Sequence, residues 1–148
     1  MDRREAILAR LQEVLGGVEG ILAVGRNVAD VPGIRRPAIL QHDGREEFFD
    51  APPRQRQSVL QLMALTPVVT INAGADGPNI GTLLNLLRAR VLPAVITDGV
   101  LHDLLGTNGR LHLASCERLQ AGPESKEGRM ELTFVFTYVL SLTELSAG

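Results

Sequence analysis

The glycine-rich connection Gly74–Thr82 is the first stretch whose residues could do chemistry. It lies between an apolar run, VVTIN, and a leucine-rich run, LLNLL, which is the strand, loop and helix order of phosphate-binding loops. Its glycines are not spaced G-x-G-x-x-G, and no Gly-Lys-Ser/Thr sequence follows them. We therefore interpret it as a loop that leads into a helix. A small phosphate- or nucleotide-binding enzyme that uses Gly74–Thr82 is kept as an alternative.

Histidine and cysteine are the other candidates for catalysis or metal binding. His112 and Cys116 share the parity of one predicted strand, which would place them on the same face. Four strand residues separate them by about 13 Å, which is too far for the hydrogen bond of a Cys–His pair. No spacing of Cys, His, Asp and Glu matches a zinc or calcium site. We therefore expect no catalytic residue, no metal ligand, no cofactor and no enzymatic activity, and interpret Cys116 as a small core or interface residue.

A charged segment with the sequence GREEFFDAPPRQRQS occupies residues 44–58. Its composition predicts a flexible loop or arm, which could not hold a catalytic pair of carboxylates rigidly. A solvated loop is the simplest interpretation. Two adjacent aromatic residues in a polar loop favour a different one, an arm that reaches a neighbouring subunit and whose removal leaves a folded monomer. The candidate interface residues are Arg45, Glu46, Glu47, Phe48, Phe49, Asp50, Arg54 and Arg56.

The element with the strongest pattern lies near the end of the chain, from Gly128 to Leu142. One parity of this run is large and apolar, and consists of Met130, Leu132, Phe134, Phe136, Tyr138 and Leu140. This alternation predicts a long strand whose buried face anchors the core. The other parity is rich in Thr and Val rather than charged, which is compatible with a second covered face.

The remaining elements are predicted from periodicity and from residues that begin or end helices and strands. Apolar spacing and end signals predict helices at Asp2–Leu15, at Ile80–Ile96 after an Asn79 cap, and at Val100–Leu105 between Asp98 and Gly106. Strands are predicted at Ile21–Asn27, at Pro37–His42 before a tight turn at Asp43-Gly44, in the second half of Val59–Asn72, and at Arg110–Leu119. Pro67 weighs against an uninterrupted central strand, and Pro93 should kink or restart its helix.

Length and composition limit the class of protein. The 148 residues are 45% hydrophobic and 22% charged, which is typical of one soluble globular domain. No run approaches the roughly 18 apolar residues that span a bilayer, so no membrane partner is expected. A net charge of −2 does not favour nonspecific binding to duplex DNA. The elements predict a single α+β domain over residues 1–148, with a small, mixed, largely antiparallel sheet covered by the N-terminal helix and the long central helix.

The order of these elements and their residue patterns resemble those of a known family. The runs that carry the likeness are REAILARLQEVL, GRN, PAILQHDG, TDGVLHDLL, NGRLHLAS and RMELTFVFTYV. They are similar to the tail terminator proteins of long-tailed bacteriophages, the minor tail protein U type and related tail-completion subunits. The likeness covers roughly residues 1–43 and 80–140, and segment 45–58 lies outside it.

The resemblance implies a structural protein of the virion. Proteins of this family form a hexameric ring at the head-proximal end of the tail tube, end its polymerisation and present the surface to which the filled head attaches. The expected partners are further copies of the chain, the tail tube protein and a head-completion or neck protein, while DNA passes through the lumen without its bases being read. The expected location is the virion, after assembly in the bacterial host cytoplasm. The alternatives are a neck or head-completion connector subunit and a non-viral adaptor that binds a peptide at the sheet edge; a prophage or gene transfer particle could also be the source.

Overall fold

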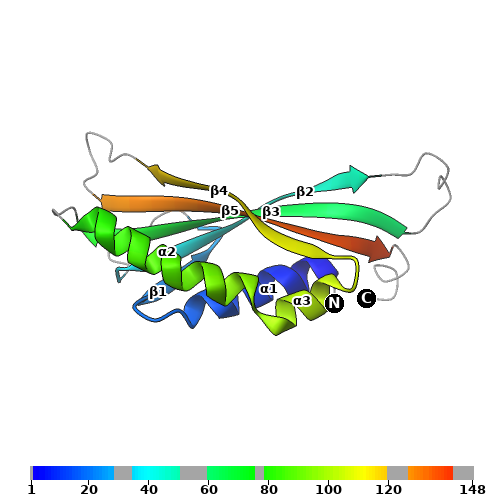
Figure 1. Cartoon of the computed structure of the whole chain (residues 1–148), viewed down its shortest axis with the longest axis horizontal. Helices are drawn as coiled ribbons and strands as arrows, with labels where there is room; N and C mark the ends of the chain where they lie inside the picture. The colour runs from blue at the N-terminus through cyan, green and yellow to red at the C-terminus, as the bar shows by residue number, and fades with distance from the viewer. Residues whose placement is uncertain (1, 29–34, 51–59, 76–78, 120–126, 142–148) are drawn as a thin grey trace.

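The computed structural model describes residues 2–28, 35–50, 60–75, 79–119 and 127–141. Within these ranges the chain folds into three helices and five strands, in the predicted order (Figure 1). The elements are α1 (Arg3–Gly16), β1 (Ala23–Arg26), β2 (Ala38–Asp50), β3 (Leu60–Ala75), α2 (Ile80–Ile96), α3 (Gly99–Leu105), β4 (Arg110–Leu119) and β5 (Glu127–Ser141).

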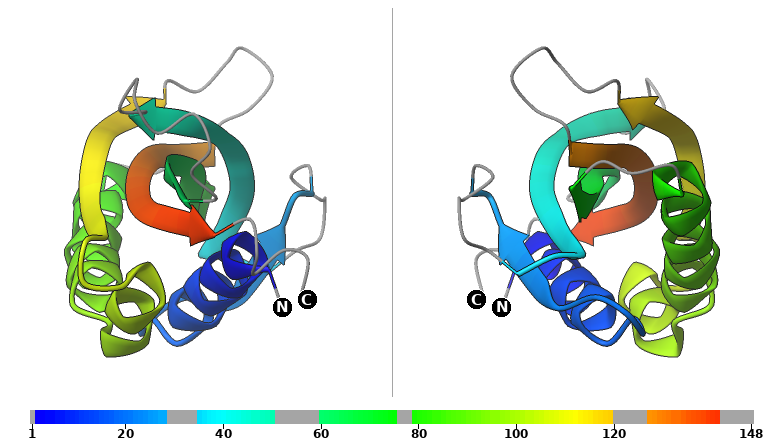
Figure 2. Two further views of the ribbon diagram at one scale, coloured as in Figure 1. Left: turned by 90° about the vertical axis from the view of Figure 1, so that its right-hand side faces the viewer. Right: turned by 90° about the vertical axis from the view of Figure 1, so that its left-hand side faces the viewer.

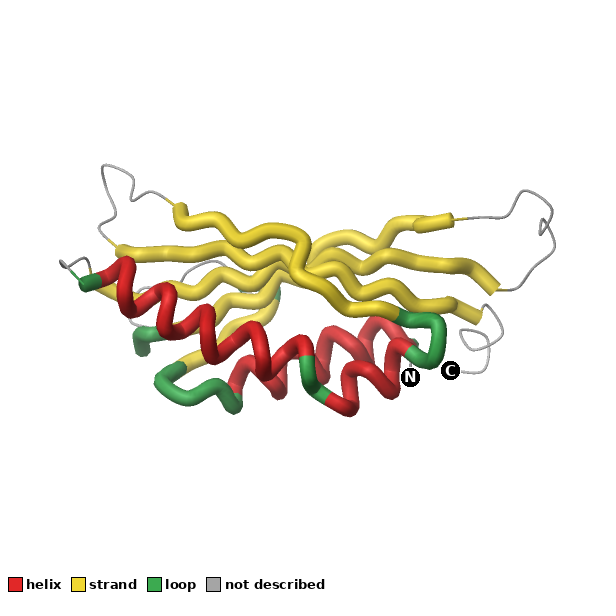
Figure 3. Tube along the Cα trace, viewed as in Figure 1, coloured by secondary structure: helices red, strands yellow, loops and turns green. Residues whose placement is uncertain are grey.

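The five strands form one sheet in the order β1-β2-β3-β5-β4. β1 runs parallel to β2, whereas β2–β3, β3–β5 and β4–β5 are antiparallel pairs. Figure 3 shows the strands as one twisted layer with the helices beneath it. The predicted α+β class, with a mixed and largely antiparallel sheet, is confirmed.

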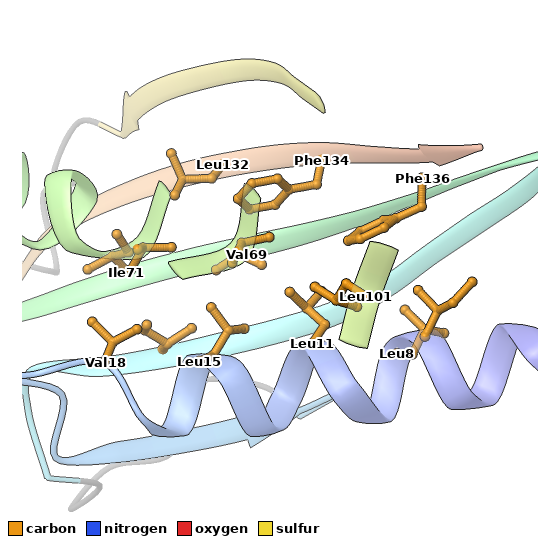
Figure 4. Close-up of a cluster of buried hydrophobic side chains, with 14 of the residues drawn as sticks. Leu8, Leu11, Leu15, Val18, Val69, Ile71, Leu101, Leu132, Phe134 and Phe136 are labelled. Carbon is orange, nitrogen blue, oxygen red and sulfur yellow. The ribbon is translucent and has the colours of Figure 1, made fainter. Parts of the chain in front are cut away.

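All three helices lie on the same face of the sheet (Figures 1 and 2). The buried residues of α1 follow the predicted spacing and are Ile7, Leu8, Leu11 and Leu15. Figure 4 shows these leucines and Leu101 of α3 pointing toward the side chains of β3 and β5. We call the covered side the helical face and the other side the open face.

The long strand β5 supplies the centre of the core. Its even-numbered residues from Met130 to Leu140 are buried on the helical face, as predicted. The rings of Phe134 and Phe136 lie with their centroids 6.4 Å apart in a tilted arrangement. Each large apolar side chain buried in this way contributes roughly 1.5–3 kcal/mol to folding. The strand therefore anchors the helices to the sheet.

β3 is a central strand in spite of Pro67, which has no N–H to donate. The neighbouring strand β2 accommodates the proline with a bulge, because His42 pairs with Val68 whereas Arg45 pairs with Thr66. Three steps along β2 thus correspond to two along β3. The extra residue lets β2 pass the position where a ladder hydrogen bond is missing. The predicted interruption of this strand is therefore wrong.

The bulge occupies Asp43-Gly44, where the sequence predicted a tight turn. Gly44 has a φ of 70°, in the region that favours glycine. A Cβ at this position would lie 1.9 Å from the carbonyl oxygen of Thr66, so the two strands can approach only without a side chain here. The Asp-Gly pair bends the strand instead of reversing it, and the turn prediction is wrong.

β2 consequently continues well beyond the predicted end at His42. Residues Arg45–Asp50 pair with β3, for example Phe48 with Met63 and Asp50 with Leu62. The prediction of a flexible arm at 44–58 is therefore wrong for its first part, and residues 51–58 lie outside the described residues. Deletion of the whole segment would remove half of a sheet strand, so the expectation of a folded monomer no longer holds.

The helix boundaries follow the sequence closely. The Asp98 carboxylate caps α3 by accepting a 2.9 Å hydrogen bond from the backbone N–H of Leu101, and Gly106 ends the helix with a φ of 81°. α2 begins after Asn79, although the Asn79 side chain makes no capping hydrogen bond. Pro93 lies inside α2, which continues to Ile96 without a restart.

Membrane-spanning length was tested on the described helices. No single helix is long and apolar enough to cross a bilayer. α2 and α3 together would pass on length and composition, but they are bent by 48° at their junction. Ile80, Leu84, Leu87, Val91 and Val95 of α2 and Leu101 and Leu105 of α3 lie in the core, whereas Leu86 and Val100 are exposed.

Candidate assembly surface

The bulge in β2 decides which predicted interface residues face outward. Arg45 pairs with Thr66 on the open face, and Glu46 pairs with Leu65, which is fully buried on the helical face. Because successive side chains of a strand point to opposite faces, Glu47 lies on the open face. The two adjacent acidic residues therefore have different roles.

Glu46 is bound within its own chain. Its carboxylate accepts a hydrogen bond from the hydroxyl of Tyr138, and it lies 3.7 Å from the guanidinium of Arg4. Burial, together with the negative charge of Glu46, raises the pKa of Tyr138 above its ordinary range. Glu46 thus connects β2, β5 and α1 and belongs to a strand rather than to a loop, while its part in a subunit interface stays a prediction.

Arg45 and Glu47 are exposed and form an ion pair with each other on the open face. Such a pair contributes little to stability because water screens it. Phe48, Phe49 and Asp50 belong to the end of β2, and Arg54 and Arg56 lie outside the described residues. Among the predicted residues whose side chains the structure describes, which are Arg45, Glu46 and Glu47, the exposed ones are Arg45 and Glu47.

The open face carries small and β-branched side chains in its centre. The small and β-branched half-buried residues of β3 and β5 on this face are Ala64, Thr66, Val68, Thr70, Thr133, Val135 and Val139, and Leu62, Arg129 and Glu131 are also half-buried there. No described helix or strand packs on them (Figure 2). The parity of β5 indicated this surface in the sequence, because Thr and Val alternate there with the core residues.

One end of the open face is hollowed. A cavity of about 140 Å³ is lined by Leu40, His42, Thr70, Asn72, Leu119 and Arg129. Arg129 lies between Asn72 and Leu119 in the sheet. Leu40 and His42 belong to β2, so the cavity crosses four strands. A cavity of this size accommodates a group comparable with a benzene ring, which is the scale of one large side chain of a partner.

β4 forms one edge of the sheet and pairs only with β5 in the described chain. Its exposed residues are Arg110, His112, Ala114, Ser115, Cys116, Glu117 and Arg118. An edge strand presents a row of backbone N–H and C=O groups that another strand can use. We call this surface the β4 edge. The sequence predicted the strand but gave no sign of its place at the edge.

His112 and Cys116, which the sequence placed on one face but too far apart to pair, lie on different faces of the sheet. β4 contains a bulge, since Leu113 pairs with Phe134 and Ser115 pairs with Thr133. The bulge reverses the alternation, so His112 lies on the open face and Cys116 on the helical face. The expected shared parity is wrong, and Cys116 is exposed rather than part of the core.

A charged network holds α1 against β1 and β2. The guanidinium of Arg26 donates to Asp43 at 3.0 Å and to Glu5 at 2.8 and 2.9 Å. Asn27 donates to the same Asp43 carboxylate at 2.7 Å. Gln41 donates from the sheet to the carbonyl oxygen of Leu8 in α1 at 3.0 Å.

The acids of this network are held in their charged form. Burial alone would raise the pKa of Asp43, but hydrogen bonds from Arg26 and Asn27 outweigh burial and lower the pKa below its ordinary value. The hydrogen bond from Arg26 likewise lowers the pKa of Glu5. Because these carboxylates are ionised and engaged within the chain, the network is suited to positioning α1 rather than to proton transfer.

The glycine-rich connection is only partly described, because residues 76–78 lie outside the described ranges. At its start, a Cβ on Gly74 would lie 3.3 Å from the Cβ of Arg36. At its end, a Cβ on Gly81 would lie 3.0 Å from the Arg118 guanidinium, which therefore lies beside the first turn of α2. No group of three or more His, Cys, Asp and Glu side chains in the described chain is arranged to hold a metal ion.

No protein-family model matches the sequence, and no curated protein matches it significantly. A functional assignment therefore depends on the sequence resemblance and on the surfaces described above.

Proposed function

We propose that the chain is a structural subunit of a phage tail, a terminator that closes into a ring at the head-proximal end of the tail tube. In this role it ends tube polymerisation and offers the joining surface for the head. Its partners are other copies of itself, six in a ring, the tail tube protein and a head-completion or neck protein. The role is structural and involves no enzymatic step.

The main observation behind the proposal is that the three helices cover one face of the sheet, while no described helix or strand covers the open face. Four long strands about 4.8 Å apart, with about ten residues each at 3.3 Å, give the open face an area on the order of 600 Å². Stable protein interfaces bury about 800 Å² per partner. A face of this size with Thr and Val at its centre is suited to contact between subunits or with the tube.

Ring closure needs a contact that joins two different patches of neighbouring subunits. The open face and the sheet edge formed by β1, at the opposite end of the strand order from β4, supply two such patches. The cavity beside Arg129 offers a place for one protruding side chain. A net charge of −2 is compatible with a conduit through which DNA slides.

A phosphate-binding enzyme is the second candidate, and one observation favours it. The guanidinium of Arg118 lies beside Gly81 in the first turn of α2, where the helix dipole also attracts anions. Inorganic phosphate and ATP should raise the melting temperature of the protein if this candidate is right, and Arg118→Ala should abolish the rise.

The ring is tested by the mass of the purified protein in solution, measured by light scattering after size exclusion over a range of concentrations. The expected species is close to six subunits. Val135→Arg, at the centre of the open face, should leave the fold intact by circular dichroism and remove the ring. Asn85→Arg, at an exposed position on α2, is the matched control and should leave the ring unchanged.

Two outcomes contradict the proposal. One is a ring that persists in the folded Val135→Arg variant, because the open face would then have no part in it. The other is a monomer at every concentration that also fails to bind the ends of assembled tail tubes.

A further inference from the structure

The β4 edge has a pattern of side chains that is complementary to itself. The bulge at Ala114 divides the strand into two halves whose faces alternate in opposite phase. The side chains on the open face are Arg110 and His112 before the bulge, and Ser115 and Glu117 after it. Those on the helical face are Leu111 and Leu113 before the bulge, and Cys116 and Arg118 after it, while Leu119 ends the strand on the open face. On moving away from the Leu113–Ala114 bond in either direction, the side chains therefore occupy the same faces in the same order, from His112 to Arg110 on one side and from Ser115 to Glu117 on the other.

The two ends of this pattern are Arg110 and Glu117, which carry opposite charges. Arg110 and Glu117 lie equally far from the Leu113–Ala114 bond, and in the described chain neither side chain forms an ion pair. Glu117 lies directly opposite Glu131 of β5, and like charges placed opposite each other weaken a sheet. A positive group beside Glu117 would relieve this repulsion.

We propose that two copies of this chain pair antiparallel along their β4 edges, with a two-fold axis at the Leu113–Ala114 bond. In this register Arg110 of each copy faces Glu117 of the other, and Leu111 faces Cys116. Backbone hydrogen bonds join the two five-stranded sheets into one. The inference rests on the β4 edge alone and does not depend on the proposed function.

The contact has a consequence for assembly. A two-fold contact uses the same patch on both copies, so no free patch of that kind remains after it forms. It therefore joins two copies and cannot by itself build a ring. It leaves the open face of both copies accessible. The pair is therefore a form of the free protein that coexists with, or precedes, assembly through the open face.

The register is tested by disulfide formation. Directly opposite residues of antiparallel strands have Cα atoms about 4.5–5.5 Å apart, which lies within the range of disulfides. Leu111→Cys should therefore form a covalent dimer with the partner's Cys116 under mild oxidation. His112→Cys, the next residue on the open face, should cross-link at least tenfold more slowly, because it lies on the face opposite to the partner's Cys116 and the two substituted residues would be about 11 Å apart. The unmodified protein should not cross-link, because the two Cys116 residues would be about 17 Å apart.

Charge reversal tests the pairing independently of oxidation. Glu117→Arg and Arg110→Glu should each raise the dimer dissociation constant about tenfold or more by analytical ultracentrifugation. The double variant that carries both changes should restore it to within about threefold of the original. Ser115→Thr, at an exposed open-face position of the same strand, should change it little.

The outcomes separate this inference from the proposed function. A folded Leu111→Cys variant that yields no covalent dimer, or a double variant that stays as weak as the single ones, overturns the β4 pairing. A ring without the Leu111–Cys116 cross-link overturns the pairing and leaves the proposed function intact. The cross-link without any ring, in solution or on tail tubes, supports the pairing and counts against the terminator role.

Discussion

The hydroxyl of Tyr138 donates a hydrogen bond to the carboxylate of Glu46, across 92 residues of sequence. Tyr138 is fully buried in β5, and Glu46 lies in the part of β2 beyond the bulge. Arg4 of α1 approaches the same carboxylate at 3.7 Å. Glu46, from a segment whose sequence predicts a charged loop, thus connects β2, β5 and α1 at the end of the core.

Tyr138→Phe should lower the free energy of unfolding by about 1–2 kcal/mol, because it removes one buried hydrogen bond to a charged acceptor and keeps the ring. The measurement is a urea titration followed by far-UV circular dichroism, since the chain contains no Trp. Glu47→Gln is the matched control at the next residue, which is exposed, and should cost no more than about 0.5 kcal/mol. Equal effects of the two variants would mean that the Tyr138 bond contributes no net stability.

Gly44→Ala should destabilise the protein by more than about 2 kcal/mol. The positive φ disfavours any residue with a Cβ, and this Cβ would meet the carbonyl oxygen of Thr66 at 1.9 Å. Gly99→Ala is the control, because a Cβ there meets nothing within 4 Å and Ala favours the helix that it begins. It should be neutral or up to about 1 kcal/mol more stable in the same titration. A tolerated Gly44→Ala would show that the bulge can shift.

The sequence predicts those elements whose signals are local. The helix Ile80–Ile96 and the strand Arg110–Leu119 have the predicted bounds, because leucine periodicity and an Asn-Gly turn fix them without help from elsewhere. Alternation along β5 likewise identifies both its buried and its open side. The α+β class follows from these elements together.

The parts that the sequence does not predict depend on contacts between distant residues. Arg45–Asp50 is a strand because β3 pairs with it and because Tyr138 binds Glu46, and neither partner is visible locally. A bulge changes which face each later residue occupies, so the face predicted for Cys116 is wrong, and the face of Glu46 cannot be counted from His42. The place of β4 at the sheet edge follows from strand order, which no single segment encodes.

Acid should destabilise the protein more steeply than its composition suggests. The pKa values of Asp43 and Glu5 are lowered mainly by hydrogen bonds from Arg26, against burial in the case of Asp43. For groups with a lowered pKa, the added stability is present above the unfolded pKa of about 4 and is lost as the pH falls through the lower folded value. The free energy of unfolding should therefore be flat above about pH 5 and fall below about pH 4.

Asp43→Asn tests this origin of the acid sensitivity. It should be less stable than the original protein at pH 7 by about 1–3 kcal/mol and show a shallower loss between pH 4 and 2. Asp103→Asn, at an exposed position on α3, serves as the control and should leave both the stability and its pH profile unchanged. An Asp43→Asn profile parallel to that of the original protein would place the acid-sensitive groups elsewhere.

Asp98 combines two roles that substitution can separate. Its carboxylate caps α3 through the backbone N–H of Leu101 and also accepts hydrogen bonds from Arg10 of α1 at 2.7 and 3.0 Å. The hydrogen bond from Arg10 lowers the pKa of Asp98 below its ordinary value. Asp98→Ala removes both roles and should cost about 1–2 kcal/mol in a urea titration at pH 7.

Asp98→Asn keeps a capping oxygen and loses only the charge, so it should cost clearly less than Asp98→Ala at pH 7. The Asn variant should approach the original protein as acid protonates the Asp98 carboxylate, whereas Asp98→Ala still lacks a capping oxygen and should stay less stable than both. Helix capping dominates if Asn restores most of the lost stability, and the link between α1 and α3 dominates if Asn is as damaging as Ala. We expect the first result, because water screens the partly exposed Arg10–Asp98 pair more than the capping bond.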